Sequence, residues 1–121
     1  GATWLMKYHI EAGHALSERD TSNLIASTDN LTSWAACLHI CQIVRYLKVT
    51  TSQAQQLADW SDSLHDHKRP FLRAWSLDAL VALVQQHALL QPKAQKVLAK
   101  AKADPAASGR ARARNLDTVL N

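Results

Sequence analysis

One cluster in this 121-residue sequence combines side chains that bind metal ions. Asp62, His65 and Asp66 are three and four residues apart, so a helix would place them on one face. Carboxylate oxygens and imidazole nitrogens can together hold a divalent cation, which would suit a small metal-dependent enzyme. The same residues, with His67 beside them, also suit the last turn of a helix, where the helix dipole favours histidine. We expect this structural role, and the metal enzyme is the weakest of three functional interpretations.

A second group, His9, Glu11 and His14, contains the same types of side chain. Positions 9 and 14 lie about 140° apart around a helix axis. The spacing also matches no zinc motif. A solvated helix is the better interpretation, and we expect neither a metal nor another cofactor.

The two cysteines, Cys37 and Cys41, could supply a reactive thiolate. They share one face of a strongly helical stretch, where a disulfide would strain the helix. His39 points to a different face, and no base that would activate a thiol is evident. We therefore predict two reduced, buried side chains, a cytoplasmic location and no enzymatic activity.

Positive charge is concentrated in the last quarter of the chain. The formal net charge is +4, and residues 93–121 carry seven Lys or Arg against two Asp. The predicted basic patch contains Lys93, Lys96, Lys100, Lys102, Arg110, Arg112 and Arg114. Such a patch can neutralise phosphates, bind an acidic protein, or pair with aspartates on neighbouring helices. No aromatic residue is interleaved after Trp75, so nucleic acid is the weaker alternative.

Helices must position all of these residues. Ala and Leu supply 37 of the 121 residues, and the chain has only three Gly and three Pro, which predicts an all-α protein. Apolar spacing and capping residues predict helices over 3–16, 30–48, 53–66, 70–87, 92–103 and 106–120, and a short turn near Leu24 and Ile25. Ser52 and Gln55 form a capping-box pattern before one of them. No apolar run approaches the ~20 residues that span a bilayer.

A repeat with a 39-residue offset relates three of these helices. The aligned positions are Ala35, Ala74 and Ala113, followed by Leu38, Leu77 and Leu116. The preceding helices, 53–66 and 92–103, share the offset. A pair of helices cannot bury its apolar face alone, so repeated pairs are expected to stack on one another.

A unit of two antiparallel helices with this period resembles a HEAT repeat. The stretches "RPFLRAWSLDALVAL" and "DPAASGRARARNLDTVL" are similar to the second-helix signature of that family. Asp104, followed by Arg110, resembles the Asp and Arg that bridge neighbouring HEAT repeats. The resemblance covers roughly residues 15–120. Asp66 and Arg73 depart from the spacing of that pair, and the unit at Trp34 lacks the aligned Arg.

The resemblance implies a short right-handed α-α superhelix of about two and a half to three helical hairpins. The whole chain, 1–121, is then one domain. Within it we expect N-terminal helices in 2–28 and repeat-like segments over 30–66, 70–103 and 106–120. A monomer is favoured over a dimer, because polar residues on both end helices can cap the stack.

One layer of helices lines a concave face in such a superhelix. The implied outward strip contains Trp34, His39, Gln42, Arg45, Arg73, Ser76, Asp78 and Arg112. Trp34 aligns with Arg73 and Arg112, so we expect it to be a partly exposed binding anchor. The other three tryptophans are expected in the core.

The predicted function is a non-enzymatic scaffold that binds a protein partner, in particular an acidic one, through the concave strip or the basic patch. The alternative is a nucleic-acid-associated HEAT-like protein that uses the Lys/Arg stripe at 93–114. Some HEAT-like DNA glycosylases grip DNA on a basic concave face, but this chain shows no convincing catalytic acid. Asp78 is a candidate by position alone.

Overall fold

A computed structural model of the chain describes residues 2–121. Every regular element in this range is helical, which confirms the all-α prediction. The seven α-helices are α1 (Ala2–Glu11), α2 (Glu18–Ser27), α3 (Trp34–Ile43), α4 (Thr51–His65), α5 (Pro70–Gln86), α6 (Gln91–Ala101) and α7 (Ala107–Leu120). Single 3₁₀ turns follow three of them, at Thr28–Asn30, Val44–Tyr46 and Ala88–Leu90.

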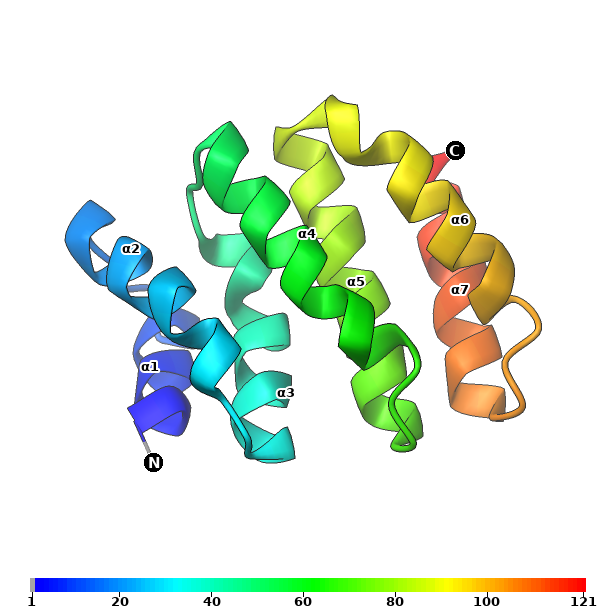
Figure 1. Cartoon of the computed structure of the whole chain (residues 1–121), viewed down its shortest axis with the longest axis horizontal. Helices are drawn as coiled ribbons and strands as arrows, with labels where there is room; N and C mark the ends of the chain where they lie inside the picture. The colour runs from blue at the N-terminus through cyan, green and yellow to red at the C-terminus, as the bar shows by residue number, and fades with distance from the viewer. Residues whose placement is uncertain (1) are drawn as a thin grey trace.

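The helices form two layers (Figure 1). Helices α2, α4 and α6 make the layer nearer to the viewer, and α1, α3, α5 and α7 make the layer behind it. Neighbours within the rear layer pack in the order α1, α3, α5, α7. Short connections force each pair of consecutive helices from α3 onward into an antiparallel hairpin, which produces this alternation between layers.

Helix α5 is the centre of the molecule. It packs against α3 and α7 in its own layer and against α4 and α6 in the other. A helix covered on so many sides must be apolar around most of its circumference. Its side chains that are at most 2% exposed include Leu72, Leu77, Leu80, Val81 and Leu83. Pro70 occupies the first turn, where its missing N–H costs nothing.

The first helix ends earlier than its apolar spacing predicts. It stops at Glu11 because Gly13 adopts φ +97°, a left-handed conformation that favours glycine and terminates a helix. The chain then begins a full helix rather than a short turn, with the Ser17 hydroxyl accepting from the N–H of Asp20 at 3.1 Å. The predicted 3–16 helix therefore ends at Glu11, and α2 extends the expected turn near Leu24 on both sides.

The predicted 30–48 helix is also shorter at both ends. It starts at Trp34, capped by Ser33, and tightens into the 3₁₀ turn after Ile43. The capping box before α4 uses Thr50 and Gln53 instead of the pair two residues later. The Thr50 hydroxyl accepts from the N–H of Gln53 at 3.1 Å, and the Gln53 side chain accepts from the N–H of Thr50 at 3.0 Å.

Helix α1 carries exposed apolar side chains. Trp4, Leu5 and Tyr8 are each more than half exposed, and Lys7 pairs with Glu11 at 3.2 Å beside them. Across the described residues, no helix combines the length and the apolar character that crossing a bilayer requires.

Candidate functional site

The exposed side of the α3/α5/α7 layer carries tryptophans covered by arginines. The guanidinium of Arg112 lies 4.4 Å from the centre of the Trp75 ring, and that of Arg45 lies 5.5 Å from it. Arg69 covers Trp34 at 4.1 Å in the same way. Each such contact is worth about 0.5–2 kcal/mol, depending on how well water is excluded. We call Trp34, Arg45, Arg69, Trp75 and Arg112 the Trp–Arg face.

Asp78 organises the centre of this face. Its carboxylate accepts a hydrogen bond from Arg112 Nη1 at 3.0 Å and another from Arg45 Nη2. Asp78 is 7% exposed, whereas the Arg45 side chain is 42% exposed. One carboxylate thus holds two guanidinium groups against Trp75.

Helix geometry explains why these residues meet. Phe71, Trp75, Asp78 and Ala82 recur every three or four residues, so they form one stripe along α5. Phe71 is 68% exposed at the start of this stripe. Because α3 and α7 flank α5, their side chains reach the stripe from both sides.

The predicted concave strip divides into three places. Trp34, Arg45, Asp78 and Arg112 belong to the Trp–Arg face or contact it directly. Gln42 is half-buried and lies one helical turn before Arg45.

The other three strip residues lie elsewhere. His39 faces α1, with its Nδ1 3.1 Å from the hydroxyl of Thr3, and burial together with the charge of Lys7 lowers its pKa. Arg73 and Ser76 point towards α4 and α6, and Ser76 is fully buried. The helix period explains this direction. Position 73 is about 200° from position 75 around the axis, and position 76 is about 200° from position 78.

The prediction that Trp4 lies in the core is wrong, because Trp4 is 52% exposed, whereas Trp60 and Trp75 pack against the core and are partly buried. Arg69 is not among the predicted residues. Trp75 is only partly buried. Its outer surface is covered by the guanidinium groups of Arg45 and Arg112 and not by apolar side chains. The stripe from Phe71 to Ala82 was the available signal for Trp75. Arg69 precedes α5, and nothing in its local sequence connects it to Trp34.

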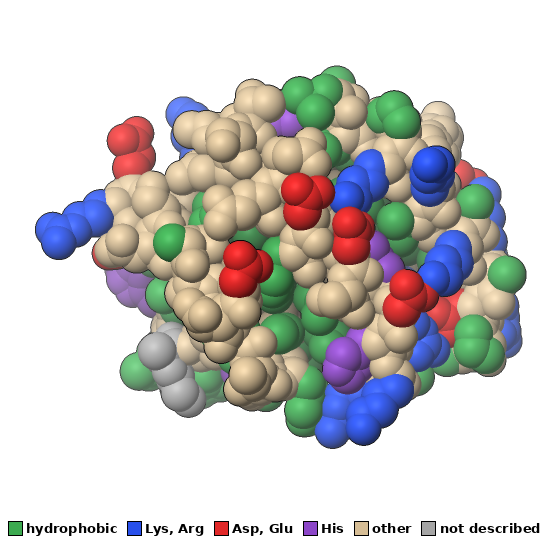
Figure 2. All heavy atoms as spheres, viewed as in Figure 1, with side chains coloured by type: hydrophobic (Ala, Val, Ile, Leu, Met, Phe, Trp, Pro, Cys, Tyr) green, Lys and Arg blue, Asp and Glu red, His purple; other side chains and the backbone are tan. Residues whose placement is uncertain are grey.

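Most of the predicted basic patch is paired with aspartates. Lys93 Nζ lies 3.3 Å from Asp59 and 2.9 Å from Asp62, and Lys100 pairs with Asp66. Figure 2 shows acidic side chains over α4 beside lysines over α6. Exposed pairs of this kind contribute at most about 1 kcal/mol each, but they neutralise the lysine stripe locally.

The C-terminal members of the patch are largely paired as well. Lys102 lies 3.2 Å from Asp117, and Arg110 donates to the backbone carbonyl of Asp104 at 2.7 Å. Within residues 2–121, only Lys96 and Arg114 of the patch have neither an ion pair nor a side-chain hydrogen bond. The surface is therefore a mosaic of charges rather than a continuous positive stripe.

The ion pairs between α4 and α6 also point the candidate metal ligands in different directions. Asp62 and Asp66 turn towards lysines of α6, while His65 turns inward. His9 and His14 stack on each other at 4.6 Å. No cluster of three potential metal ligands occurs among the described residues. Asp62, His65 and Asp66 each have a partner within the protein.

Both cysteines are free and buried. Burial raises the pKa of Cys37 and raises that of Cys41 further, so both thiols stay protonated near neutral pH. A protonated, enclosed thiol is a poor nucleophile. The predicted burial of both cysteines is confirmed.

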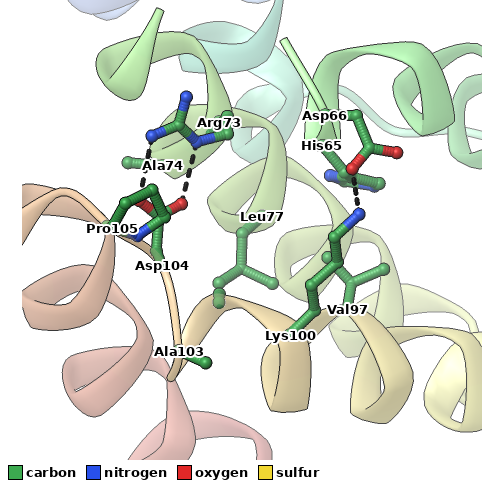
Figure 3. Close-up of a pocket in the computed structure, with 12 residues that line it drawn as sticks. His65, Asp66, Arg73, Ala74, Leu77, Val97, Lys100, Ala103, Asp104 and Pro105 are labelled. Carbon is green, nitrogen blue, oxygen red and sulfur yellow. Dashed lines mark hydrogen bonds and ion pairs between the residues drawn. The ribbon is translucent and has the colours of Figure 1, made fainter. Parts of the chain in front are cut away.

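A cleft of about 390 Å³ lies where α4 and α6 end and α7 begins (Figure 3). Arg73 and Asp104 form one wall, joined by two hydrogen bonds of 2.8 and 2.9 Å. Arg73 also donates to the carbonyl of His67 at 2.8 Å. The carboxylate of Asp104 therefore bridges neighbouring helical hairpins by pairing with Arg73. Arg110, which the HEAT resemblance pairs with Asp104, reaches only its backbone carbonyl.

His65 lies at the opposite wall of the cleft. Its Nδ1 is 2.9 Å from the hydroxyl of Ser76, and its Nε2 is 3.2 Å from that of Ser61. Both serines are buried, at 2% exposure or less. Burial lowers the pKa of His65 to about 4, with Asp62 and Asp66 acting against this and Lys93 and Lys100 adding to it. The imidazole is therefore neutral at physiological pH.

We expect His65 to destabilise the fold in acid. The pKa of an unperturbed histidine is about 6.5, so between that pH and about 4 the unfolded chain binds a proton that the folded protein excludes. The free energy of unfolding should therefore fall by about 2 kcal/mol between pH 7 and pH 4.5. Urea titrations at both pH values measure this, with His65→Gln as the comparison. An equal pH dependence in the variant would contradict the prediction.

Comparison with models of known protein families, with curated protein sequences and with solved structures gives no match.

Proposed function

We propose that this chain is a protein-binding module that has no enzymatic role and recognises an acidic segment of its partner through the Trp–Arg face. The observation that carries the proposal is the covering of two tryptophans by three arginines on one exposed helical layer. Tryptophan and arginine are the residues most enriched among the energetic centres of protein interfaces. The exposed Phe71 adds an apolar contact on the same stripe.

Charge determines the class of partner that we propose. Arg45 and Arg112 share the single carboxylate of Asp78, and Arg69 has no ion pair within residues 2–121, so the face retains excess positive charge. An incoming carboxylate can take hydrogen bonds from the guanidinium N–H groups that Asp78 leaves free. Its neighbouring apolar side chain would contact Phe71 or Trp34. An acidic segment with one large apolar residue fits this chemistry best.

We also propose a HEAT-like architecture, with the α3/α5/α7 layer as its concave side. The 39-residue alignment supports this, because Ala74 and Ala113 are both buried at equivalent positions, as are Leu77 and Leu116. The alternation of the two layers supports it as well (Figure 1). A cytoplasmic location and a monomeric state remain predictions, and the free cysteines support the first.

Nucleic acid is the competing partner. Arginine and tryptophan on one face could contact phosphates and bases, and Lys96 and Arg114 are unpaired within residues 2–121. The pairing of the other patch lysines with aspartates disfavours it, because those acids would repel a phosphate backbone.

Selection from a random peptide library tests the proposal. We expect the enriched peptides to combine clustered Asp or Glu with a large apolar residue. Their affinity, measured by fluorescence anisotropy, should fall at least roughly tenfold for the triple variant Arg45→Ala, Arg69→Ala, Phe71→Ala. All three side chains are exposed, so the fold should tolerate their removal.

The matched control is Lys96→Ala with Arg114→Ala, which removes exposed charge outside the face. This variant should bind the peptides as the parent does. Labelled single- and double-stranded DNA and RNA are titrated in parallel at low and physiological salt. Peptide binding that is indifferent to the triple variant would refute the proposal. Salt-sensitive nucleic-acid binding that is lost in the control variant would favour the alternative.

A further inference from the structure

The cleft beside Arg73 has a floor of apolar and small side chains. Leu77 and Val97 contribute the larger apolar surfaces, and Ala74, Ala101 and Gly109 leave the space open between them. The close-up shows Leu77 at the base of the cleft between two charged pairs (Figure 3). Its volume of about 390 Å³ falls within the range of about 300–1,000 Å³ that is typical of small-molecule sites.

The buried polar groups around the cleft are occupied by partners within the protein. Both ring nitrogens of His65 lie within hydrogen-bond distance of serine hydroxyls. The carboxylate of Asp104 takes two hydrogen bonds from Arg73 and one from the N–H of Ala106 at 2.8 Å. A charged ligand would therefore have to break an existing interaction before it gained a new one.

The charges at the rim also balance. Asp66 and Lys100 pair at the mouth of the cleft, with more than 60% of each side chain exposed. On the other wall, the opposite charges of Arg73 and Asp104 cancel each other. His65 is neutral, since burial keeps its pKa low. The cleft consequently offers an apolar floor and no net charge.

We propose that this cleft binds a small, uncharged organic molecule with an apolar body, about the size of a bicyclic aromatic ring. The inference is independent of the protein-binding proposal, because it uses residues on the α4/α6 side of α5. Apolar contact with Leu77 and Val97 provides the affinity, and the exposed Asp66–Lys100 pair can open to hydrogen-bond one polar end of the ligand. Exposed ion pairs such as theirs exchange partners at little cost.

Three related probes test the charge requirement. They are 3-methylindole, which is neutral, indole-3-acetate, which is an anion, and tryptamine, which is a cation at neutral pH. Titrations are followed in two-dimensional amide NMR spectra of the whole chain. We expect 3-methylindole to produce saturable shifts at Leu77, Ala101 and Gly109, and to bind at least roughly tenfold more tightly than either ion. Equal or tighter binding of an ion would overturn the proposal.

Two variants that fill the cleft test its location. Ala101→Leu and Val97→Phe each place extra carbon atoms in the open space, so each should weaken 3-methylindole binding at least roughly tenfold. Ala99→Leu is the control, because Ala99 is exposed on the same helix and does not line the cleft. Thermal unfolding followed by circular dichroism checks that each variant is folded.

Three results would refute the inference. The first is the absence of saturable shifts at the cleft, and the second is unchanged binding in both filled variants. The third is displacement of 3-methylindole by peptides selected for the Trp–Arg face, which would make the cleft part of the protein-binding surface. Loss of peptide binding with intact 3-methylindole binding would refute only the proposed function.

Discussion

Replacing Asp104 with alanine is expected to lower the free energy of unfolding by about 3 kcal/mol. The Arg73 and Asp104 side chains are only 16% and 8% exposed, and two hydrogen bonds join them. Without the carboxylate, the guanidinium loses its charge partner while most of its side chain stays covered by the protein, and the N–H of Ala106 loses its acceptor. Urea unfolding at pH 7, followed by circular dichroism, measures the loss.

Two further variants isolate the cause. Asp104→Asn keeps an acceptor for Ala106 but removes the charge, so it should retain part of the lost stability. Asp59→Ala removes an exposed partner of Lys93 and should change the free energy of unfolding by less than about 0.5 kcal/mol. If Asp104→Ala and Asp59→Ala were equally stable, the Arg73–Asp104 pair would not hold the helices together.

The same pair should weaken in acid. Hydrogen bonds from Arg73 lower the pKa of Asp104. The stabilisation is complete above the ordinary pKa of an aspartate, about 3.9, and is lost as the pH falls through the lower pKa of the folded protein. This pH range lies below the range in which His65 lowers the stability. A pH titration of the free energy of unfolding therefore separates the contributions of His65 and Asp104.

Replacing Gly109 with alanine is expected to cost about 2 kcal/mol, although alanine normally stabilises a helix by about 1 kcal/mol relative to glycine. A Cβ atom at this position would lie 2.6 Å from Cγ of Asp104. That side chain cannot move aside without giving up its hydrogen bonds to Arg73. Glycine is therefore needed where α7 passes under the carboxylate.

A double-mutant cycle identifies this mechanism. In an Asp104→Ala background most of the overlap is gone, so Gly109→Ala should be close to neutral. Gly13→Ala is the comparison, because Gly13 has φ +97° and no atom within 4 Å of a built Cβ. Its cost of about 1 kcal/mol comes from the backbone alone and should not depend on Asp104. Additive effects of the Gly109 and Asp104 substitutions would contradict the proposed overlap.

Local sequence accounts for most of the secondary structure. The dominance of Ala and Leu, the apolar spacing and residues such as Pro70 predict the later helices to within about two residues at each end. The errors lie where short polar residues compete to start or stop a helix. Ser33 begins α3 later than predicted, and Thr50 begins α4 earlier. Such choices depend on side-chain hydrogen bonds that apolar periodicity does not encode.

The candidate sites were less accessible to sequence reasoning. The predicted strip includes Arg45, Asp78 and Arg112, which lie together in the structure, but it does not separate them from Arg73 and Ser76, which face the other layer. The lysines after residue 92 suggested a free basic surface until their aspartate partners on α4 were known.

The sequence by itself determined an all-helical chain, the approximate position of its helices and the neutral, buried character of its cysteines. Only the tertiary structure decided which arginine covers which tryptophan, which lysines are paired and where a cleft remains open. Helix formation depends on contacts three or four residues apart, which the sequence displays directly. The sites depend on contacts such as Arg45 with Asp78 and Arg73 with Asp104, which join residues more than thirty positions apart.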